Sequence, residues 1–442
     1  MTWREYHEST KHTVESLRRS RHFLDWANMP DPFRHYDGVP VLDLPADCST
    51  FLSWLLFHSA AISATKVAPG SGHRYALRVN PSSGNLHPTE FHFVTRGLKD
   101  WPDGAYHYRP SSHMVEQRAI GPVAGFEAHD APLIFILTSI PWREAWKYRD
   151  RAYRYCLLDI GHAWQALELA AESVGCDVVA LGRFDDQAVA ASLGLPADEW
   201  PMLIVEIRGL EVCALEPVDP DWTGGVPNRL SESVLSYPSI EAVHAATGNS
   251  GVAYGDRLPN LPLGLPFSGE VARRRRSALD FVGGDQSISR EQLATLIPAG
   301  TRLIQLYLYA HRVECLEPGL YRIGPDRELE LVKSGDQRVM AAALSLGQDL
   351  AGNACVAFSM VADVERATRE FGPRGYRYAF FEAGAAGHNL YVAATSLGLG
   401  ATGIGAFYDD EVHRYLGLTL DQGQVVYHFA VGYPVLDSRV QG

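Results

Sequence analysis

The chain repeats a long segment of itself. Residues 151–209 align with residues 374–432, 223 positions later, without a gap, and 20 of the 59 paired positions are identical, beginning with Arg151 and Arg374. This period lies far outside the roughly 20–50 residues of solenoid repeats, so it indicates two tandem copies of a whole domain. Duplicated domains commonly pack about a pseudo-twofold axis, as identical subunits do, so we expect a ligand site between the halves.

Composition narrows the class of protein. A length of 442 residues suits two or three domains, and the repeat selects two. The net charge of −13 argues against nucleic acid or an anionic membrane as the main partner. The sequence has no run of 18 apolar residues, and its polar start lacks the apolar core of a signal peptide. The six cysteines form no C-x-x-C pair, so we expect a cytoplasmic protein without a structural metal.

The chain divides into four expected parts. These are an N-terminal arm over 1–50, a first domain over 51–235, a linker over 236–266 and a second domain over 267–442. The arm is polar and punctuated by proline, which indicates an extended segment over a domain surface. The linker is rich in glycine, proline and asparagine. Strands lie beside helices without strict βαβ alternation, which predicts an α+β fold.

Hydrophobic patterns place matching elements in both halves. In the first half we expect a helix within 48–64, strands at 90–96 and 131–139, a charged helix over 142–154, a long helix over 159–174 and a last strand at 202–209. In the second half we expect a helix at 289–298, strands at 303–310 and 354–362, a helix through 366–370, a long helix over 382–397 and a last strand at 425–432. Segments 102–108 and 317–323 are expected to be matching turns.

Three glycine-rich or basic segments could bind a ligand. GLGATG at 398–403 formally matches the dinucleotide fingerprint, but it follows a predicted helix instead of opening one. A backbone turn near a flat ligand fits it better, and a Schellman-type helix stop is the alternative. RVNPSSGNLHPTE at 78–90 offers several donors to an anion or a heterocycle, or it caps a helix. The arginines 273–276 before Ser277 suit a phosphate, or they form a solvated face.

Together these segments resemble the SagB/ThcOx-type dehydrogenases of the nitroreductase superfamily, which are flavoproteins that bind FMN at a dimer interface. The resemblance covers nearly the whole chain. It rests on YHESTKH, FLSWLL, RVNPSSGNLHPTEFHFV, GAYHY, KYRDRAYRYCLLDIGHAWQALELA, RRSALDF and AGHNLYVAATSLGLGATGIGAFYDD. It implies a nitroreductase-like fold in two tandem copies that form an intramolecular pseudo-dimer, each with a mainly antiparallel sheet flanked by helices.

The resemblance also implies which residues contact FMN. The family's R-R-S-x-[RK]-x-F phosphate motif matches Arg275, Arg276, Ser277 and Phe281, with Leu279 where a basic residue is usual. The family's P-S-x-x-N turn matches Pro81, Ser82, Ser83 and Asn85, with Arg78 shortly before it. The loop that places backbone N–H groups near flavin N5 matches Gly403, Ile404, Gly405 and Ala406, and residues 181–183 in the first half.

Each half lacks the motif that the other half retains. The second half has PAGTRLIQL where the P-S-x-x-N turn would stand. In the first half only LRRSRHF at 17–23 imitates the R-R-S motif, and it lies too far upstream of its helix. We therefore expect one complete FMN site per chain, made from the turn of the first half and the arginines and glycine loop of the second.

An adjacent Lys-Tyr pair is the candidate catalytic group. The azoline dehydrogenases that the chain resembles are thought to use such a pair, and Lys147 and Tyr148 match it. The repeat places Glu370 and Phe371 at the same positions in the second half. A lysine with a lowered pKa can accept a proton, and a tyrosine can orient the substrate. The alternative is two ordinary residues on an amphipathic helix. The histidines lack metal-ligand spacing and are read as packing or surface residues.

The resemblance implies an FMN-dependent dehydrogenase or oxidase of natural-product biosynthesis. Its substrate would be a small molecule or a peptide-derived heterocycle such as an azoline, with hydride passing to flavin N5 and O2 as acceptor. One alternative is an NAD(P)H-dependent nitroreductase or quinone reductase, because fold alone does not choose between oxidation and reduction. The other is a catalytically inactive flavin-binding or partner-docking protein. A further homodimer is compatible with each of these.

Overall fold

The chain forms two compact units. The computed structural model describes residues 1–20, 23–70, 72, 74–213 and 219–441. Unit 1 comprises Met1–Phe23, Ala64–Ala76 and Leu261–Gly442, and unit 2 comprises Leu24–Ser63 and Leu77–Asn260. The main division therefore falls inside the segment predicted as a linker, while the N-terminal arm is shared between the units.

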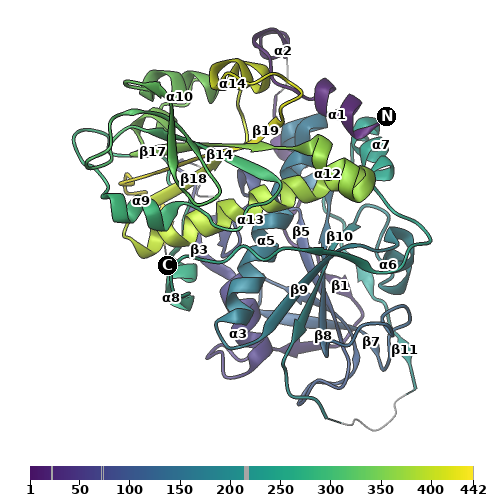
Figure 1. The fold of residues 1–442 in the computed structure, drawn as a ribbon. Helices are drawn as coiled ribbons and strands as arrows, with labels where there is room; N and C mark the ends of the chain where they lie inside the picture. The colour runs from purple at the N-terminus through teal and green to yellow at the C-terminus, as the bar shows by residue number, and fades with distance from the viewer. Residues whose placement is uncertain (21–22, 71, 73, 214–218, 442) are drawn as a thin grey trace. The chain divides into compact units, whose positions relative to one another are not determined.

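Unit 2 is built on a nine-stranded antiparallel sheet (Figure 1). In spatial order its strands are β11 (Asp221–Trp222), β7 (Met114–Ile120), β6 (Gly104–Arg109), β5 (Thr89–Thr95), β8 (Leu133–Ser139), β10 (Trp200–Arg208), β9 (Asp177–Arg183) and β13 (Gly255–Leu258), with β2 (Val41–Asp43) paired to β7. The short strands β1 (Tyr36–Asp37) and β12 (Val226–Pro227) pair separately. The helices are α3 (Phe51–Ser59), α4 (Pro141–Tyr148), α5 (Ala152–Glu172), α6 (Asp186–Ser192) and α7 (Pro238–Ala246). The long helix α5 packs on β8, β9 and β10.

Unit 1 is built on a six-stranded antiparallel sheet crossed by the long helix α13 (Gly375–Ser396) (Figure 1). In order the strands are β16 (Leu329–Ser334), β15 (Gly319–Ile323), β14 (Ile304–Ala310), β17 (Val356–Ala362), β19 (Gln424–Gly432) and β18 (Gly400–Ile404). The other helices are α1 (Trp3–Ser9), α2 (Val14–Arg19), α8 (Gly269–Arg274), α9 (Arg290–Leu296), α10 (Arg338–Leu344), α11 (Leu350–Asn353), α12 (Val364–Phe371) and α14 (Asp409–Leu416).

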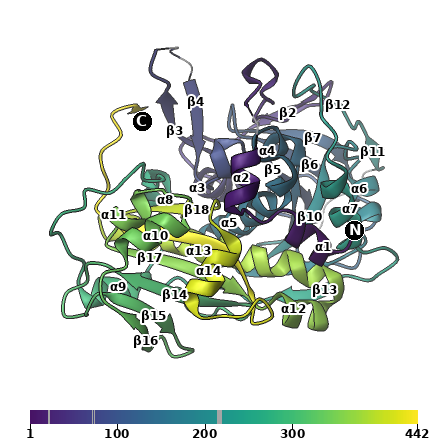
Figure 2. The same ribbon diagram turned by 90° about the horizontal axis from the view of Figure 1, so that it is seen from above.

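A small third sheet joins distant parts of the sequence. Strands β3 (Ile62–Val67) and β4 (Arg74–Arg78) lie side by side (Figure 2), and β20 (Val440–Gln441) pairs with β3. Val440 lies opposite Lys66 in this pairing. The C-terminal strand is thereby bonded to a hairpin whose residues 64–76 belong to unit 1.

The two sheets share one strand order, which confirms the duplicated α+β domain. The order β6-β5-β8-β10-β9 in unit 2 corresponds to β15-β14-β17-β19-β18 in unit 1. Strands β8 and β17 begin at Leu133 and Val356, which keep the offset of 223 residues upstream of the aligned segment. Each long helix follows a shorter helix, α4 before α5 and α12 before α13.

The prediction of turns at 102–108 and 317–323 is wrong, because both segments are strands. Gly104 begins β6, and a Cβ there would collide with the carbonyl oxygen of Ala119 on β7. Gly319 begins β15, and its Cβ would lie 2.7 Å from the carbonyl oxygen of Lys333 on β16. These glycines therefore allow neighbouring strands to pack closely, and they do not mark a reversal of the chain.

The long helices start seven residues earlier than predicted, at Ala152 and Gly375. The preceding helices end at positive φ, with Arg149 at 52° and Gly372 at 66°. These left-handed residues separate the short helix from the long one, so the predicted helix over 142–154 is two elements. As a result Asp159 lies in the second turn of α5 and not at its start.

The arm and the linker also contain regular structure. The arm, predicted as extended, contains α1, α2 and a 3-10 turn over Trp26–Asn28. Thr2 caps α1 and exchanges hydrogen bonds with Glu5 in a capping box. The linker contains α7 and β13, and β13 pairs with β9. Local capping residues and a free sheet edge therefore order segments that composition alone marks as loops.

A buried ionic cluster fixes α4 to the sheet of unit 2. The Glu90 Oε1 atom on β5 lies 2.5 Å from Arg143 of α4, and Glu90 Oε2 lies 3.3 Å from His107 Nε2 on β6. His107 Nδ1 lies 2.8 Å from Glu116 on β7. Burial opposes ionisation of Glu90, but Arg143, the His107 hydrogen bond and Arg78 lower its pKa to about 2. The carboxylate is thus held ionised inside the unit.

Glu90→Ala is expected to lower the free energy of unfolding by about 3–5 kcal/mol, because it leaves Arg143 buried without this partner. Urea unfolding at neutral pH measures the loss. Glu211→Ala is the matched control, since Glu211 pairs with Lys99 at the surface, where both side chains are largely exposed. Equal losses in the two variants would show that the buried cluster does not anchor α4.

Candidate active site

The turn after β4 is closed by its own side chains. Gly84 and Asn85 both have φ of 61°, and His87 has φ of 50°. Glycine and asparagine tolerate this left-handed region best, which explains their place in the turn. The Ser82 hydroxyl accepts a hydrogen bond from the backbone N–H of His87 at 2.8 Å, and His87 Nε2 lies 3.1 Å from Asn85 Oδ1. The predicted P-S-x-x-N segment is therefore a compact, sharply turned loop.

Arg78, predicted just before this turn, and Pro81, predicted as its first residue, are both buried. Arg78 donates a hydrogen bond to the carbonyl of Pro32 at 2.6 Å, and its guanidinium lies 5.1 Å from the Phe33 ring centroid. Burial lowers the pKa of Arg78 to about 10. The contacts of Arg78 named here tie the start of the turn to the arm segment of unit 2.

Lys147 and Tyr148 lie against the turn. A Cβ atom at Gly84 would lie 2.7 Å from the Tyr148 hydroxyl oxygen and 2.9 Å from the Lys147 Nζ atom. Both side chains are half-buried at the end of α4. The Tyr148 ring packs on Tyr155 of α5, with 4.4 Å between centroids. The structure thus brings together the predicted catalytic pair and the predicted cofactor turn of unit 2.

Asp159 on α5 accepts hydrogen bonds from the turn. The backbone N–H of Ser83 donates to both carboxyl oxygens at 3.1 Å, and the Ser83 hydroxyl donates to Oδ1 at 3.0 Å. Burial raises the pKa of Asp159 to about 7, against hydrogen bonds from Ser82 and Ser83 that lower it. The sequence prediction missed this residue. The available signal is the repeat, which pairs Asp159 with Glu382.

Glu144 is a second buried carboxyl group beside the Lys-Tyr pair. It lies three residues before Lys147 on α4 and is fully buried. Among the residues that the structure describes, neither of its oxygens has a hydrogen-bond partner of good geometry. Burial and the nearby Asp159 raise the pKa of Glu144 well above its usual range, and Lys147 opposes this rise. Sequence reasoning missed it, because a glutamate on a charged helix is expected to be exposed.

Unit 1 lacks this arrangement at the equivalent positions. Glu382 on α13 accepts hydrogen bonds from the backbone N–H groups of Arg302, Leu303 and Ile304 at 2.7, 2.7 and 3.0 Å, and burial raises its pKa to about 7. Glu370, at the Lys147 position, forms an ion pair with Arg302. Unit 1 therefore retains a carboxyl group on its long helix, Glu382, but has Glu370 in place of the Lys147 amine.

Tyr391 contacts both the predicted phosphate motif and the predicted glycine loop of unit 1. Its hydroxyl oxygen lies 2.8 Å from the Ser277 hydroxyl and accepts a hydrogen bond from the Gly403 N–H at 3.0 Å. The buried Arg275 guanidinium lies 4.9 Å from the Tyr391 ring centroid. A Cβ at Gly403 would collide with the Tyr427 hydroxyl. Tyr391 was not predicted, because a tyrosine on a buried helix face carries no distinct sequence signal.

The arginines beside Ser277 concentrate positive charge. Burial and then the charges of Arg275 and Arg273 lower the pKa of Arg276 to about 10. The Arg276 Nη1 atom donates to the carbonyls of Arg273 and Arg275 at 2.8 and 2.6 Å. Clustered guanidinium groups of this kind suit a phosphate.

The remaining residues of the predicted phosphate motif and of the predicted glycine loop also belong to unit 1. Phe281 is buried in the core cluster of the unit. Ile404 ends β18, and Gly405 and Ala406 follow it, with the Ala406 carbonyl accepting from Gln348 at 3.2 Å. In the imitation motif at 17–23, Arg18 and Arg19 are exposed on α2, while residues 21 and 22 lie outside the described residues.

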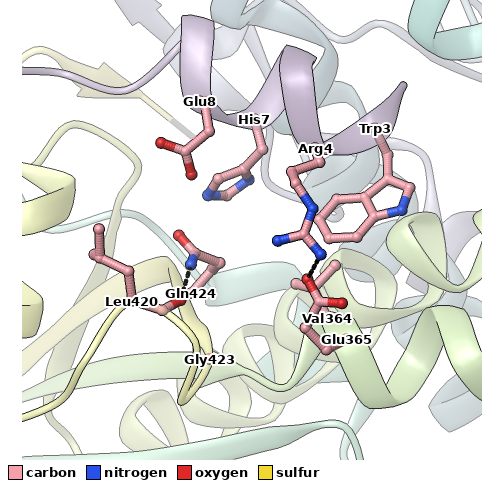
Figure 3. Close-up of a pocket in the computed structure, with 9 residues that line it drawn as sticks. All are labelled: Trp3, Arg4, His7, Glu8, Val364, Glu365, Leu420, Gly423 and Gln424. Carbon is pink, nitrogen blue, oxygen red and sulfur yellow. Dashed lines mark hydrogen bonds and ion pairs between the residues drawn. The ribbon is translucent and has the colours of Figure 1, made fainter. Parts of the chain in front are cut away.

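Unit 1 also carries a small hollow that involves none of the predicted residues (Figure 3). It lies among α1, the start of α12 and the segment before β19, with Arg4 paired to Glu365 at its edge (Figure 3). Its lining residues are Trp3, Arg4, His7, Glu8, Val364, Glu365, Leu420, Gly423 and Gln424. Across the described ranges, no helix is long and apolar enough to span a membrane. The same residues contain no cluster of three His, Cys, Asp or Glu side chains able to hold a metal ion.

Family comparison assigns the chain and its fold to a known class of proteins. The nitroreductase family model matches residues 59–209 and 272–433. The chain therefore belongs to the nitroreductase family, whose members are flavin oxidoreductases. Two matched segments confirm that the family domain occurs twice.

Individual relatives agree with this assignment. A crystal structure of a nitroreductase-type protein from Anabaena variabilis is 27% identical, with a TM-score of 0.83 over 98% of this chain and 99% of that one. A protein of Methanocaldococcus jannaschii named as a nitroreductase is 36% identical over 115 residues, which are 26% of this chain and 58% of the relative. The microcin B17-processing protein McbC of Escherichia coli is 28% identical over 155 residues, which are 32% of this chain and 56% of McbC. The chain thus matches little more than half the length of the last two relatives.

Asp159→Asn is expected to flatten part of the pH dependence of stability. The pKa of Asp159 rises from 3.8 to about 7 on folding, so the folded state holds the proton more tightly. The contribution of Asp159 to the free energy of unfolding is about 4 kcal/mol. It is fully present below pH 4 and is lost as the pH rises to about 7. Chemical unfolding between pH 4 and 8 measures the difference between wild type and variant. Asp177→Asn, at an exposed position, is the control. A pH-independent difference for Asp159→Asn would contradict the assignment.

Proposed function

We propose that the chain is an FMN-dependent dehydrogenase that oxidises a peptide-derived heterocycle, such as an azoline, in natural-product biosynthesis, with O2 as the acceptor. The observation that carries the proposal is the contact of Lys147 and Tyr148 with Gly84, since it joins the predicted base to the predicted cofactor turn. Family membership supports a flavin, and the similarity to a microcin B17-processing protein supports a modified-peptide substrate.

The residues present suit FMN. In unit 1, Arg275, Arg276 and Ser277 offer guanidinium and hydroxyl donors for the phosphate. In the same unit the backbone at Gly403, Ile404, Gly405 and Ala406 would face the flavin ring, and the collision that a Cβ at Gly403 would cause explains the glycine there. In unit 2, the turn formed by Pro81, Ser82, Ser83 and Asn85 would hold the flavin. When bound, FMN supplies the hydride acceptor at N5.

The chain's own residues then handle the proton. Lys147 would take a proton from a carbon of the substrate, as a positioned general base. Tyr148 would orient the substrate by donating a hydrogen bond. Burial, followed by the charge of Glu144, raises the pKa of Tyr148 well above its usual range, so its hydroxyl keeps its proton at neutral and moderately alkaline pH.

Reduction of a nitroaromatic or a quinone by NAD(P)H is the second candidate function. It is favoured by the similarity over 98% of the chain to a structure named as a nitroreductase. NAD(P)H added without oxygen bleaches the flavin if this function holds. An azoline substrate bleaches it under the same conditions if the dehydrogenase function holds.

Arg275→Ala and Ser277→Ala are each expected to weaken FMN binding by about 10- to 100-fold. Each change removes a charge-assisted hydrogen bond to the phosphate, which contributes about 1.5–3 kcal/mol. Flavin released by heat and counted against protein measures retention, and wild type is expected to carry one FMN per chain. Arg18→Ala and Arg19→Ala are the controls, since both arginines are exposed on α2. Equal FMN loss in both pairs, or two FMN per wild-type chain, would overturn this assignment of the phosphate.

Lys147→Ala is expected to retain its flavin spectrum but to slow substrate oxidation by about 10²–10⁴-fold, because it removes the general base alone. The rate is measured as flavin reduction by a thiazoline-containing peptide in the absence of oxygen, so that reoxidation does not hide the step. Tyr148→Phe should cost less, because only a hydroxyl is removed. A wild-type rate in Lys147→Ala would make the lysine structural.

A matched glycine pair tests the geometry of the same step. Gly84→Ala adds a Cβ against Lys147 and Tyr148 at a φ of 61°. Gly283→Ala adds one at a similar φ of 69°, with nothing within 4 Å. Backbone strain is thus nearly equal in the two variants, and only Gly84→Ala is expected to slow flavin reduction.

A further inference from the structure

The Tyr391 side chain of α13 is fixed by two strands of the unit 1 sheet. The backbone N–H of Gly403 on β18 donates a hydrogen bond to the Tyr391 hydroxyl oxygen at 3.0 Å. The Tyr391 ring packs edge-on against Phe429 of β19, with 4.8 Å between the ring centroids. The side chain is also buried. Both the hydroxyl and the ring of Tyr391 therefore have a defined position in the fold of this unit.

Ser277 is held by the same strand and by Tyr391. Its backbone forms a parallel bridge with Ala401 of β18, and the next N–H, that of Ala278, donates to the Ala401 carbonyl at 2.8 Å. The Ser277 hydroxyl oxygen lies 2.8 Å from the Tyr391 hydroxyl oxygen. The hydroxyl of an exposed serine rotates to suit its surroundings, whereas this one has a fixed neighbour. Tyr391 therefore restricts the positions that the Ser277 hydroxyl can take.

Tyr391 also contacts the Arg275 guanidinium, through its ring. The guanidinium carbon lies 4.9 Å from the ring centroid, which is within the range of a cation–π interaction. The Arg275 side chain is buried, so the ring is part of what surrounds its charge. One tyrosine thus contacts two of the predicted phosphate donors, the serine with its hydroxyl and the arginine with its ring.

Donors that are fixed in advance favour an anion of matching shape. A ligand that binds preordered side chains does not have to restrict their rotation, so less conformational entropy is lost on binding. Hydrogen bonds to a phosphate are charge-assisted and belong to the stronger polar contacts in proteins. The affinity for a phosphate therefore depends on how well the Ser277 hydroxyl is held relative to the Arg275 guanidinium.

The repeat places a glutamate where Tyr391 stands in the second half. Residues 168 and 391 are 223 positions apart within the aligned segments, and residue 168 is Glu168. Glu168 is buried, and burial, followed by the charge of Glu172, raises its pKa well above the usual range. The first half has only the LRRSRHF imitation of the R-R-S motif. The tyrosine hydroxyl thus occurs in the copy that has the phosphate motif, and an acidic group occurs in the copy that lacks it.

We propose that Tyr391 is a positioning residue for the cofactor phosphate, and that it makes the site select FMN over riboflavin, the same flavin without the phosphate. The inference rests on the proposed function of Arg275, Arg276 and Ser277 in binding FMN. Tyr391 acts through Ser277: the Gly403 N–H fixes the Tyr391 hydroxyl, and this hydroxyl holds Ser277 in place as a phosphate donor. Riboflavin offers Ser277 no phosphate, so its binding does not depend on the contact between Ser277 and Tyr391.

Tyr391→Phe tests the proposal, because it removes the hydroxyl but keeps the ring that contacts Arg275 and Phe429. Each flavin is titrated into the full-length apoprotein, and its dissociation constant is measured from the change in flavin fluorescence. The dissociation constant of FMN is expected to rise about tenfold, and that of riboflavin by less than about twofold. A merely structural role of Tyr391 would weaken the binding of both flavins alike.

Tyr309→Phe is the matched control. Tyr309 is also buried in unit 1, and its hydroxyl accepts a hydrogen bond from the Ser359 hydroxyl at 3.2 Å. The variant therefore breaks a serine–tyrosine pair of the same kind in the core of the same unit. Its preference for FMN over riboflavin is expected to equal that of wild type, which separates the loss of a phosphate donor from a general loss of stability.

A second comparison tests whether Tyr391 acts through Ser277. In protein that already carries Ser277→Ala, the addition of Tyr391→Phe is expected to raise the FMN dissociation constant by less than about twofold, because the group that Tyr391 positions is gone. Tyr391→His serves in both tests if Tyr391→Phe does not fold, since it keeps an aromatic ring but has no hydroxyl.

The possible outcomes separate this inference from the proposed function. The proposal is overturned if Tyr391→Phe weakens both flavins equally or neither of them, or if its effect adds in full to that of Ser277→Ala. Wild-type protein that binds FMN and riboflavin equally well, or Arg275→Ala protein that retains FMN normally, contradicts the proposed phosphate site instead. The second failure is seen without any change at Tyr391.

Discussion

The hydrogen bonds from Ser83 to Asp159 connect the two parts of unit 2 on which the candidate site depends. They join a sharply bent turn to the second turn of the buried helix α5, at 3.0–3.1 Å. Because the turn is fixed there, Gly84 lies directly against Lys147 and Tyr148. Burial removes water from the Asp159 carboxylate, which disfavours its charged form and raises its pKa. The site is therefore built around a group that titrates near neutrality.

Comparison of the halves shows which parts of this design belong to the fold and which belong to one copy. Glu382 plays the part of Asp159 in unit 1, although it receives three backbone N–H groups before β14 instead of a serine turn. A carboxyl on the long helix is thus common to both copies. The Lys147 amine and the Glu144 carboxyl occur in unit 2 alone of the two copies. The arginine cluster with Tyr391 occurs in unit 1 alone of the two copies. Duplication has allowed the two copies to specialise.

Much of the fold was predictable from the sequence, because the repeat and the apolar strands are long and periodic. The strands β5, β8, β14 and β17 were placed correctly within a residue or two. The strands that begin at Gly104 and Gly319 were read as turns, since a glycine that permits close strand packing looks the same in sequence as one that permits a reversal. At the candidate site, family motifs predicted Lys147, Tyr148 and the turn. Asp159, Glu144 and Tyr391 were not, because their roles depend on burial and on neighbours far away in the sequence.

The discontinuity of unit 1 has a consequence for how the chain is made. Helix α1 belongs to this unit, where Trp3 stacks on Tyr376 and His7 Nδ1 lies 3.2 Å from its hydroxyl, although 369 residues separate His7 from Tyr376. During synthesis the whole of unit 2 emerges before the partner of α1 exists. Domains generally fold as units in the order in which they are made, and contacts between distant residues form late. Helix α1 is therefore synthesised long before Tyr376, so this contact within unit 1 forms only after all of unit 2 has been made.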